Sequence, residues 1–178
     1  MTRQIKFAHI TMRGGQEAVL STVELEPGLY ETMLLSPDGE REFGLRSTDK
    51  GTAISDFNFL YKQYHVETLT GKYAELAKDL EAAAAYGMEV AANTEDGGTC
   101  NFDSSATLNL RGWRSAKVKA AAKAAGVGCS VWNLYGSKRY VFSIPGCGQG
   151  NAKMVAAEAM REALQLSGYD AGMYYRMD

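Results

Sequence analysis

The stretch CSVWNLYGSKRYVFSIPGCGQGN, residues 129–151, decides how the second half of this chain folds. Its β-branched and aromatic residues lie on both sides of Gly136-Ser137, a pattern that predicts two strands joined by a tight turn. Three glycines between residues 146 and 150 then predict a turn that leads into a helix. The stretch therefore predicts a hairpin followed by a helix, and the neighbouring strands and helices are assigned relative to it.

Outward from the hairpin, the second half reads as a strand, a helix, the hairpin, a second helix and a last strand. Alternation predicts a strand at residues 102–110, and small and apolar residues predict a helix at about 114–125. A second helix is expected at about 151–166 and a closing strand at 169–177. This β-α-β-β-α-β order is ferredoxin-like, and right-handed crossovers place both helices on one face of the sheet.

Four alternating segments in the first half predict an antiparallel β-meander, with strands at residues 5–12, 18–25, 29–35 and 42–46. They are separated by turn residues, most clearly in the run SPDG at residues 36–39, where proline and glycine suit a tight turn. The expected fold class is α+β, with a β-meander and two helices followed by a ferredoxin-like βαββαβ unit.

The two helices of the first half are expected after the meander. The first spans residues 53–64 with Thr52 as its N-cap. The second spans about 71–86, with Gly87 as its C-terminal stop. Four consecutive alanines at residues 82–85 would allow another element to approach the second helix closely.

Charge is distributed unevenly along the chain. Residues 1–98 carry 9 Lys/Arg and 16 Asp/Glu, a net charge of −7, whereas residues 99–178 carry 10 and 5, a net charge of +5. The polar stretch 93–98 is interpreted as a linker, so the expected lobes are 1–92 and 99–178. A basic lobe favours a nucleic acid or a charged partner, but two self-complementary lobes fit the same asymmetry.

The composition is that of an ordinary globular protein, with 178 residues, 46% hydrophobic and 22% charged. No apolar run reaches the roughly 18–20 residues that span a bilayer, and the N-terminus lacks the apolar core of a secretory signal. We therefore expect a cytoplasmic protein without membrane association. The three cysteines, Cys100, Cys129 and Cys147, are scattered and form no CxxC pair. They are expected to be free thiols, and neither a metal nor a cofactor is expected.

The second strand of the hairpin partly matches an RNA-recognition pattern, in which aromatic residues of a sheet stack on bases. Lys138, Tyr140 and Phe142 fit that pattern, and a period of two places both aromatic residues on one face. Arg139 stands where the pattern has a small residue, and Ala106 stands where the first strand would carry an aromatic one. Packing of Tyr140 and Phe142 against the helices is the alternative.

A cluster of cations surrounds the first helix of the ferredoxin-like unit. Its members are Arg111, Arg114, Lys117, Lys119 and Lys123, and Trp113 stands just before the helix. Such a patch can meet phosphates or an acidic protein surface, and an ordinary solvated helix face explains the same residues. Together with Lys138, Arg139, Tyr140 and Phe142, these residues form the predicted surface for a nucleic acid or a protein partner.

The glycine loop is a second candidate site. Gly146, Gly148 and Gly150 lead into a helix whose first turn contains Lys153, and backbone N–H groups at a helix start can bind an anion. A loop that needs several positive φ angles explains the same glycines without a ligand. No catalytic arrangement is recognised: no GxSxG elbow exists, and both histidines, His9 and His65, lie in the first half.

The second half resembles small proteins carried by phages and integrative elements of gut Firmicutes. The residues that carry the resemblance are the runs WNLYGSKRYVF at 132–142, GQGN at 148–151, AAEAM at 156–160 and GYDAGMYYRMD at 168–178. Some small proteins of such elements are anti-CRISPR proteins that bind a type II CRISPR nuclease. The resemblance implies a non-enzymatic inhibitor that binds a host defence protein, and it assigns no individual residues. The alternative is a nucleic-acid-binding module with a basic and aromatic sheet face.

Overall fold

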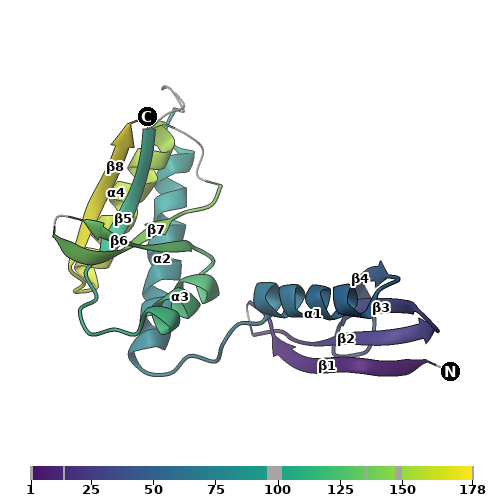
Figure 1. Ribbon diagram of the computed structural model, residues 1–178. Helices are drawn as coiled ribbons and strands as arrows, with labels where there is room; N and C mark the ends of the chain where they lie inside the picture. Colours follow the sequence, from purple (N-terminus) through teal and green to yellow (C-terminus); the bar gives the residue numbers. More distant parts are fainter. Residues whose placement is uncertain (1, 14, 96–101, 135, 147–149, 178) are drawn as a thin grey trace. The chain divides into compact units, whose positions relative to one another are not determined.

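The computed structural model describes residues 2–13, 15–95, 102–134, 136–146 and 150–177, and it shows an α+β chain (Figure 1). The chain divides into two compact units, residues 1–68 and residues 69–178. Each unit contains one sheet of four strands. No helix in the described part of the chain is both long enough and apolar enough to cross a membrane.

The first unit is the predicted antiparallel meander, with strand order β1-β2-β3-β4. Its strands are β1 (Arg3–Thr11), β2 (Glu17–Glu26), β3 (Leu29–Leu35) and β4 (Arg41–Ser47). The helix α1 (Lys50–Tyr64) follows β4 and packs on this sheet. Its apolar side meets one face of the sheet in a small core of Ile10, Ala18, Leu20, Leu34, Phe57 and Leu60.

Helix α1 begins three residues earlier than the sequence pattern predicts, because Asp49 rather than Thr52 caps it. The Asp49 carboxylate accepts hydrogen bonds from the Thr52 backbone N–H at 2.6 Å and from the Thr52 hydroxyl at 2.9 Å. A second polar contact lies in the core, where the Thr32 hydroxyl donates to the Ala53 carbonyl at 3.1 Å. These bonds fix the start of α1 against the sheet.

The second unit contains the predicted ferredoxin-like arrangement. Its elements are β5 (Phe102–Leu108), α3 (Ser115–Ala124), β6 (Gly128–Leu134), β7 (Ser137–Ser143), α4 (Asn151–Leu166) and β8 (Ala171–Met177). The sheet has the order β6-β7-β5-β8 with every neighbouring pair antiparallel, as the split βαβ topology requires. Both helices lie on one face, since their apolar residues share one core with the central strands.

Helix α2 (Lys72–Ala92) differs from the prediction in its length and in its partners. It continues past Gly87, which was predicted to end it, and it packs against α3 and α4 of the second unit. The boundary therefore differs from the predicted lobe 1–92, since the chain divides into its two compact units between Thr68 and Leu69. The later part of the expected linker 93–98 lies outside the described residues.

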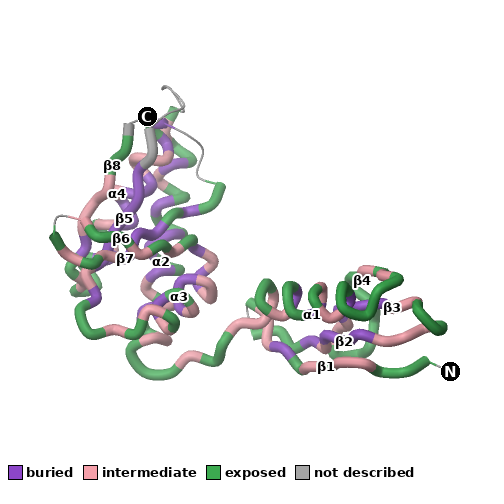
Figure 2. Tube along the Cα trace, viewed as in Figure 1, coloured by how far each residue is buried: buried purple, intermediate pink, exposed green. Residues whose placement is uncertain are grey.

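Helix α2 belongs to the second unit because its apolar residues complete the core of that unit. Leu76 and Leu80 are fully buried in the same core as β5 and α4. A Cβ atom on Gly87 would lie 2.6 Å from the Ala156 carbonyl oxygen and 2.8 Å from Cδ1 of Ile144. Gly87 is thus a position where α2 and α4 approach tightly, and Figure 2 shows buried residues along both helices.

Candidate functional site

Tyr140 and Phe142 are core residues, so the predicted stacking face at these two positions is wrong. Both side chains point toward the helices and are 1% and 0% exposed. The Tyr140 hydroxyl is within hydrogen-bonding distance of the Ser115 hydroxyl, at 3.0 Å, and donates to the Trp113 carbonyl at 3.4 Å. These contacts tie β7 to the start of α3, which is the packing that the alternative interpretation expected.

The opposite face of sheet β6-β7-β5-β8 carries a different aromatic pair, Trp132 and Tyr174. The strand register places Trp132 beside Arg139 and Tyr174 beside Ser105, on the side away from the helices. The two rings come from the two edge strands and meet edge to face, with centroids 4.8 Å apart and planes at 89°. The sequence pattern missed them because they are 42 residues apart and only the sheet brings them together.

Arg139, predicted to belong to the binding surface, is held by contacts within the second unit. Its guanidinium donates to the Thr107 hydroxyl and to the Asp170 carboxylate, both at 3.3 Å. Asn109 donates to the other oxygen of Asp170 at 2.8 Å. The arginine side chain is 17% exposed, and Gly172 leaves the room that it needs, since a Cβ there would lie 3.1 Å from its Nη1.

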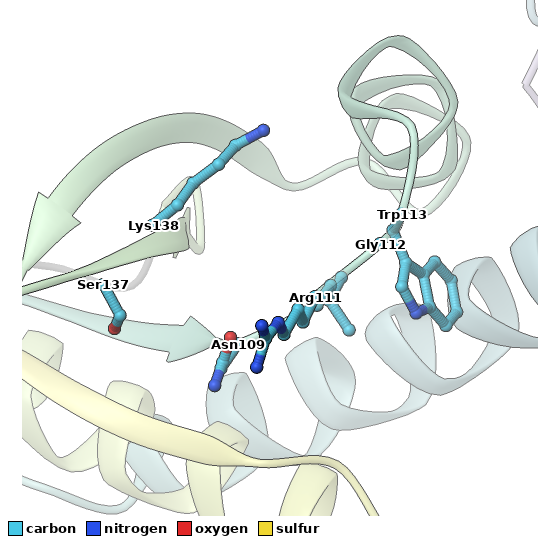
Figure 3. Close-up of a pocket in the computed structure, with 7 residues that line it drawn as sticks. Asn109, Arg111, Gly112, Trp113, Ser137 and Lys138 are labelled. Carbon is cyan, nitrogen blue, oxygen red and sulfur yellow. The ribbon is translucent and has the colours of Figure 1, made fainter.

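The structure gathers Arg111 and Lys138, two other predicted cations, around a pocket of about 370 Å³ (Figure 3). The pocket lies where β5 runs into the loop before α3 and where β7 begins. Its lining residues are Asn109, Leu110, Arg111, Gly112, Trp113, Ser137 and Lys138. The Lys138 ammonium donates to the Ser115 hydroxyl at 2.7 Å and lies 5.3 Å from the centre of the Tyr140 ring. The Lys138 wall of the pocket is therefore positioned by Ser115 and by the buried Tyr140.

The start of α3 adds to the positive potential near the pocket. The helix has no side-chain cap and no acidic residue in its first turn, so the positive end of its dipole is not neutralised there. Arg114 is the N-cap residue, and its backbone N–H donates to the Tyr73 hydroxyl at 3.2 Å. The chemistry of this end of the unit thus favours an anion.

Trp113 lines the pocket, but its ring serves mainly to dock helix α2. It meets Tyr73 edge to face at 5.2 Å, and the Lys72 ammonium lies 4.4 Å from the centre of its ring. Lys117, Lys119 and Lys123 lie further along α3 and do not line the pocket. Burial lowers the pKa of Lys123. Of the predicted basic cluster, Arg111 therefore joins Lys138 at the pocket wall.

The predicted anion loop is described only in part. Gly146 and Gly150 have φ angles of 79° and 58°, values that favour glycine, while Gly148 lies outside the described residues. Gly150 is the N-cap of α4, and Lys153 stands in the first turn of that helix. The backbone conformation accounts for the two described glycines, and anion binding at this loop stays a prediction.

Two groups that could serve as a nucleophile or a base, Cys129 and His65, are set by their surroundings within the chain. Burial raises the pKa of the Cys129 thiol to about 11, with Lys119 opposing the shift, so the thiol is protonated at neutral pH. The His65 Nδ1 accepts a hydrogen bond from the Thr11 N–H at 3.4 Å, and its ring stacks on Tyr61. Within the described ranges, no group of three His, Cys, Asp or Glu residues is placed to hold a metal.

No protein-family model, curated protein or solved structure matches this chain. The site is therefore defined by its own geometry. It is a basic pocket at one end of the second sheet, and the face of that sheet away from the helices carries Trp132 and Tyr174.

Proposed function

We propose that this protein binds a nucleic-acid strand without catalysing a reaction on it, and that the pocket holds a backbone phosphate. The observation that carries the proposal is that Arg111 and Lys138 both line one cavity of about 370 Å³. The two cations come from different segments of the second unit, the β5–α3 loop and β7. Arginine and lysine are the side chains that most often hold phosphates, and phosphate contacts supply much of the affinity for nucleic acids.

The neutral residues of the pocket support the same ligand. Asn109 and Ser137 add an amide and a hydroxyl, which serve as hydrogen-bond partners of phosphate and sugar oxygens. Among the described residues that line the pocket there is no acidic side chain and no histidine, so none of them repels an anion or acts as a general base at neutral pH. These side chains suit binding rather than bond cleavage.

The experiment is a fluorescence-anisotropy titration of the full chain with a labelled oligonucleotide at several salt concentrations. We expect the logarithm of the binding constant to fall linearly with the logarithm of the salt concentration. Arg111→Gln and Lys138→Gln should each weaken binding and reduce the slope by about 1, because each variant leaves one phosphate without its cation. Lys50→Gln, which removes an exposed cation from α1 in the first unit, is the charge-matched control and should leave both values unchanged.

Two outcomes would overturn the proposal. One is binding that is absent or insensitive to salt. The other is a stable complex with a CRISPR nuclease or another host defence protein, formed by a protein that binds no nucleic acid on its own. The second outcome would favour the inhibitor that the sequence resemblance implies, with the same basic residues facing an acidic protein surface.

A further inference from the structure

We infer that Trp132 and Tyr174 form a stacking platform for an unpaired base, so that the ligand is single-stranded nucleic acid. The inference rests on the proposed function and names the class of its substrate. The second unit carries both an aromatic pair and the pocket proposed to hold a phosphate. Stacking of bases on aromatic side chains is how proteins commonly hold single strands.

The first support is the accessibility of the aromatic pair. Trp132 is 37% exposed although it lies in a strand, and its edge-to-face contact with Tyr174 leaves flat ring surfaces that the partner ring does not cover. Helices α3 and α4 lie on the other face of the sheet, and the described residues of this unit place no helix over Trp132. An exposed indole held at a fixed angle is suited to receiving a second flat ring.

The second support is the floor beneath the pair. Ser105, Thr107 and Val141 are 4%, 1% and 6% exposed, although they point away from the helices. Such burial follows from the cover that Trp132, Tyr174 and the Arg139 side chain provide on this face. The platform therefore rests on packed small residues, and its rings have little room to collapse into the sheet.

The third support is the continuity between the platform and the pocket. The register places Trp132 opposite Arg139, on the face away from the helices. The Lys138 ammonium lies on the helix side, at Ser115 and Tyr140. By strand alternation, Asn109 and Ser137 therefore form the part of the pocket that shares a face with Trp132. Asn109 is also linked through Asp170 to Arg139. A strand held at Asn109 and Ser137 can thus extend a base toward Trp132 along this face.

Stacking on this platform selects against a duplex. A base must be unpaired and unstacked before its face can meet Trp132, and a base inside a double helix has both faces covered by its neighbours. The pocket alone would bind the phosphates of a duplex and of a single strand alike. A higher affinity for a single strand than for a duplex therefore depends on the platform and not on the pocket.

The test compares oligothymidylate of about ten nucleotides with an abasic strand of equal length and equal charge. The wild-type full chain should bind the base-containing strand about tenfold more tightly than the abasic strand. Trp132→Ala should lower the affinity for oligothymidylate about tenfold and leave the affinity for the abasic strand unchanged, whereas Trp132→Phe should retain most of the preference. Tyr86→Ala removes an aromatic residue of α2 that is 47% exposed and should change neither affinity.

The readouts separate this inference from the proposed function. Equal binding of the two strands by the wild-type protein would overturn the platform, and the effect of Arg111→Gln on both strands would still support the pocket. Equal weakening of both strands by Trp132→Ala would also overturn it, since that result indicates a structural role. If neither strand binds, the pocket and the platform fail together. The wild-type comparison and Trp132→Phe decide the matter even if Trp132→Ala does not fold.

Discussion

Several single residues determine where helices begin, because their side chains form hydrogen bonds at the ends of these elements. Asp49 caps α1, and the Tyr140 hydroxyl holds the segment before α3. Arg139 behaves in the same way, because its guanidinium binds Thr107 and Asp170 within the unit. A cation or an aromatic residue in a sequence is therefore a candidate for binding only after such internal partners are known.

The Asp49 cap predicts a pH dependence at the start of α1. Hydrogen bonds from Thr52 hold the pKa of Asp49 below its ordinary value of 3.8. A carboxyl group with a lowered folded-state pKa stabilises the fold fully above its unfolded pKa, and this contribution is lost as the pH falls through the folded pKa. The Thr52 amide resonance, followed by NMR from about pH 6 to about pH 2, should shift with a midpoint below 3.8.

The matched variant for this titration is Asp49→Asn. The asparagine amide keeps an oxygen that caps the Thr52 N–H but does not ionise in this pH range. The Thr52 resonance of the variant should stay constant over the same pH range. A midpoint at or above 3.8 in the wild-type protein would show that the cap does not favour the carboxylate.

Among the elements, the pair α2 and α4 shows how small residues control helix packing. Ala83 and Ala84 of α2 and Ala156 of α4 are buried in the contact, and Gly87 removes even a methyl group from it. Close approach of two helices gains dispersion contacts along their whole length. Glycine in a helix normally costs about 1 kcal/mol relative to alanine, and here the tighter packing compensates for that cost.

Gly87→Ala should accordingly destabilise the second unit in spite of its better helix propensity. The added Cβ would lie 2.6 Å from the Ala156 carbonyl oxygen, which is backbone and cannot move aside without shifting α4. Overpacking of this kind costs about 1–3 kcal/mol, more than the propensity gain of about 1 kcal/mol. Urea denaturation followed by circular dichroism should show a lower midpoint.

The control for this variant is Ala85→Leu, which enlarges an exposed position of the same helix. Its free energy of unfolding should stay within about 0.5 kcal/mol of the wild type. A gain in stability for Gly87→Ala would mean that the two helices can separate at no energetic cost, contrary to the packing described.

At the scale of the whole molecule, the boundary between the units changes the meaning of the charge pattern. Residues 1–68 carry seven Lys/Arg and ten Asp/Glu, a net charge of −3, and residues 69–98 carry two and six, a net charge of −4. More than half of the acidic excess therefore belongs to the segment that contains α2, which packs within the otherwise basic unit. The charge asymmetry between the halves of the sequence therefore does not coincide with the division into the two units.

The same boundary predicts which fragment folds. Residues 69–178 should form a stable unit, whereas residues 99–178 lack Leu76 and Leu80, which are fully buried in its core. Each buried leucine contributes about 1.5–3 kcal/mol, a large share of the roughly 5–15 kcal/mol that stabilises a domain. Thermal unfolding should be cooperative for the longer fragment and absent or shifted well downward for the shorter one.

Helix α2 is the main difference between the two fragments, so its peptide provides the control. Adding a synthetic peptide of residues 69–95 to the short fragment should restore part of its stability if α2 acts through packing. Cooperative unfolding of the 99–178 fragment at the temperature of the longer one would show that α2 is dispensable, and it would support the boundary that the polar stretch 93–98 suggested.

The sequence by itself determined the elements and their order, since alternation, turn residues and helix periodicity are local properties. The hairpin at 129–144, the meander and the ferredoxin-like order were all predictable in this way. Only the tertiary structure decided which face of the hairpin is buried, where α2 belongs, and that Trp132 and Tyr174 meet. These outcomes depend on contacts between residues far apart in the chain, and no local pattern contains the free energy of such contacts.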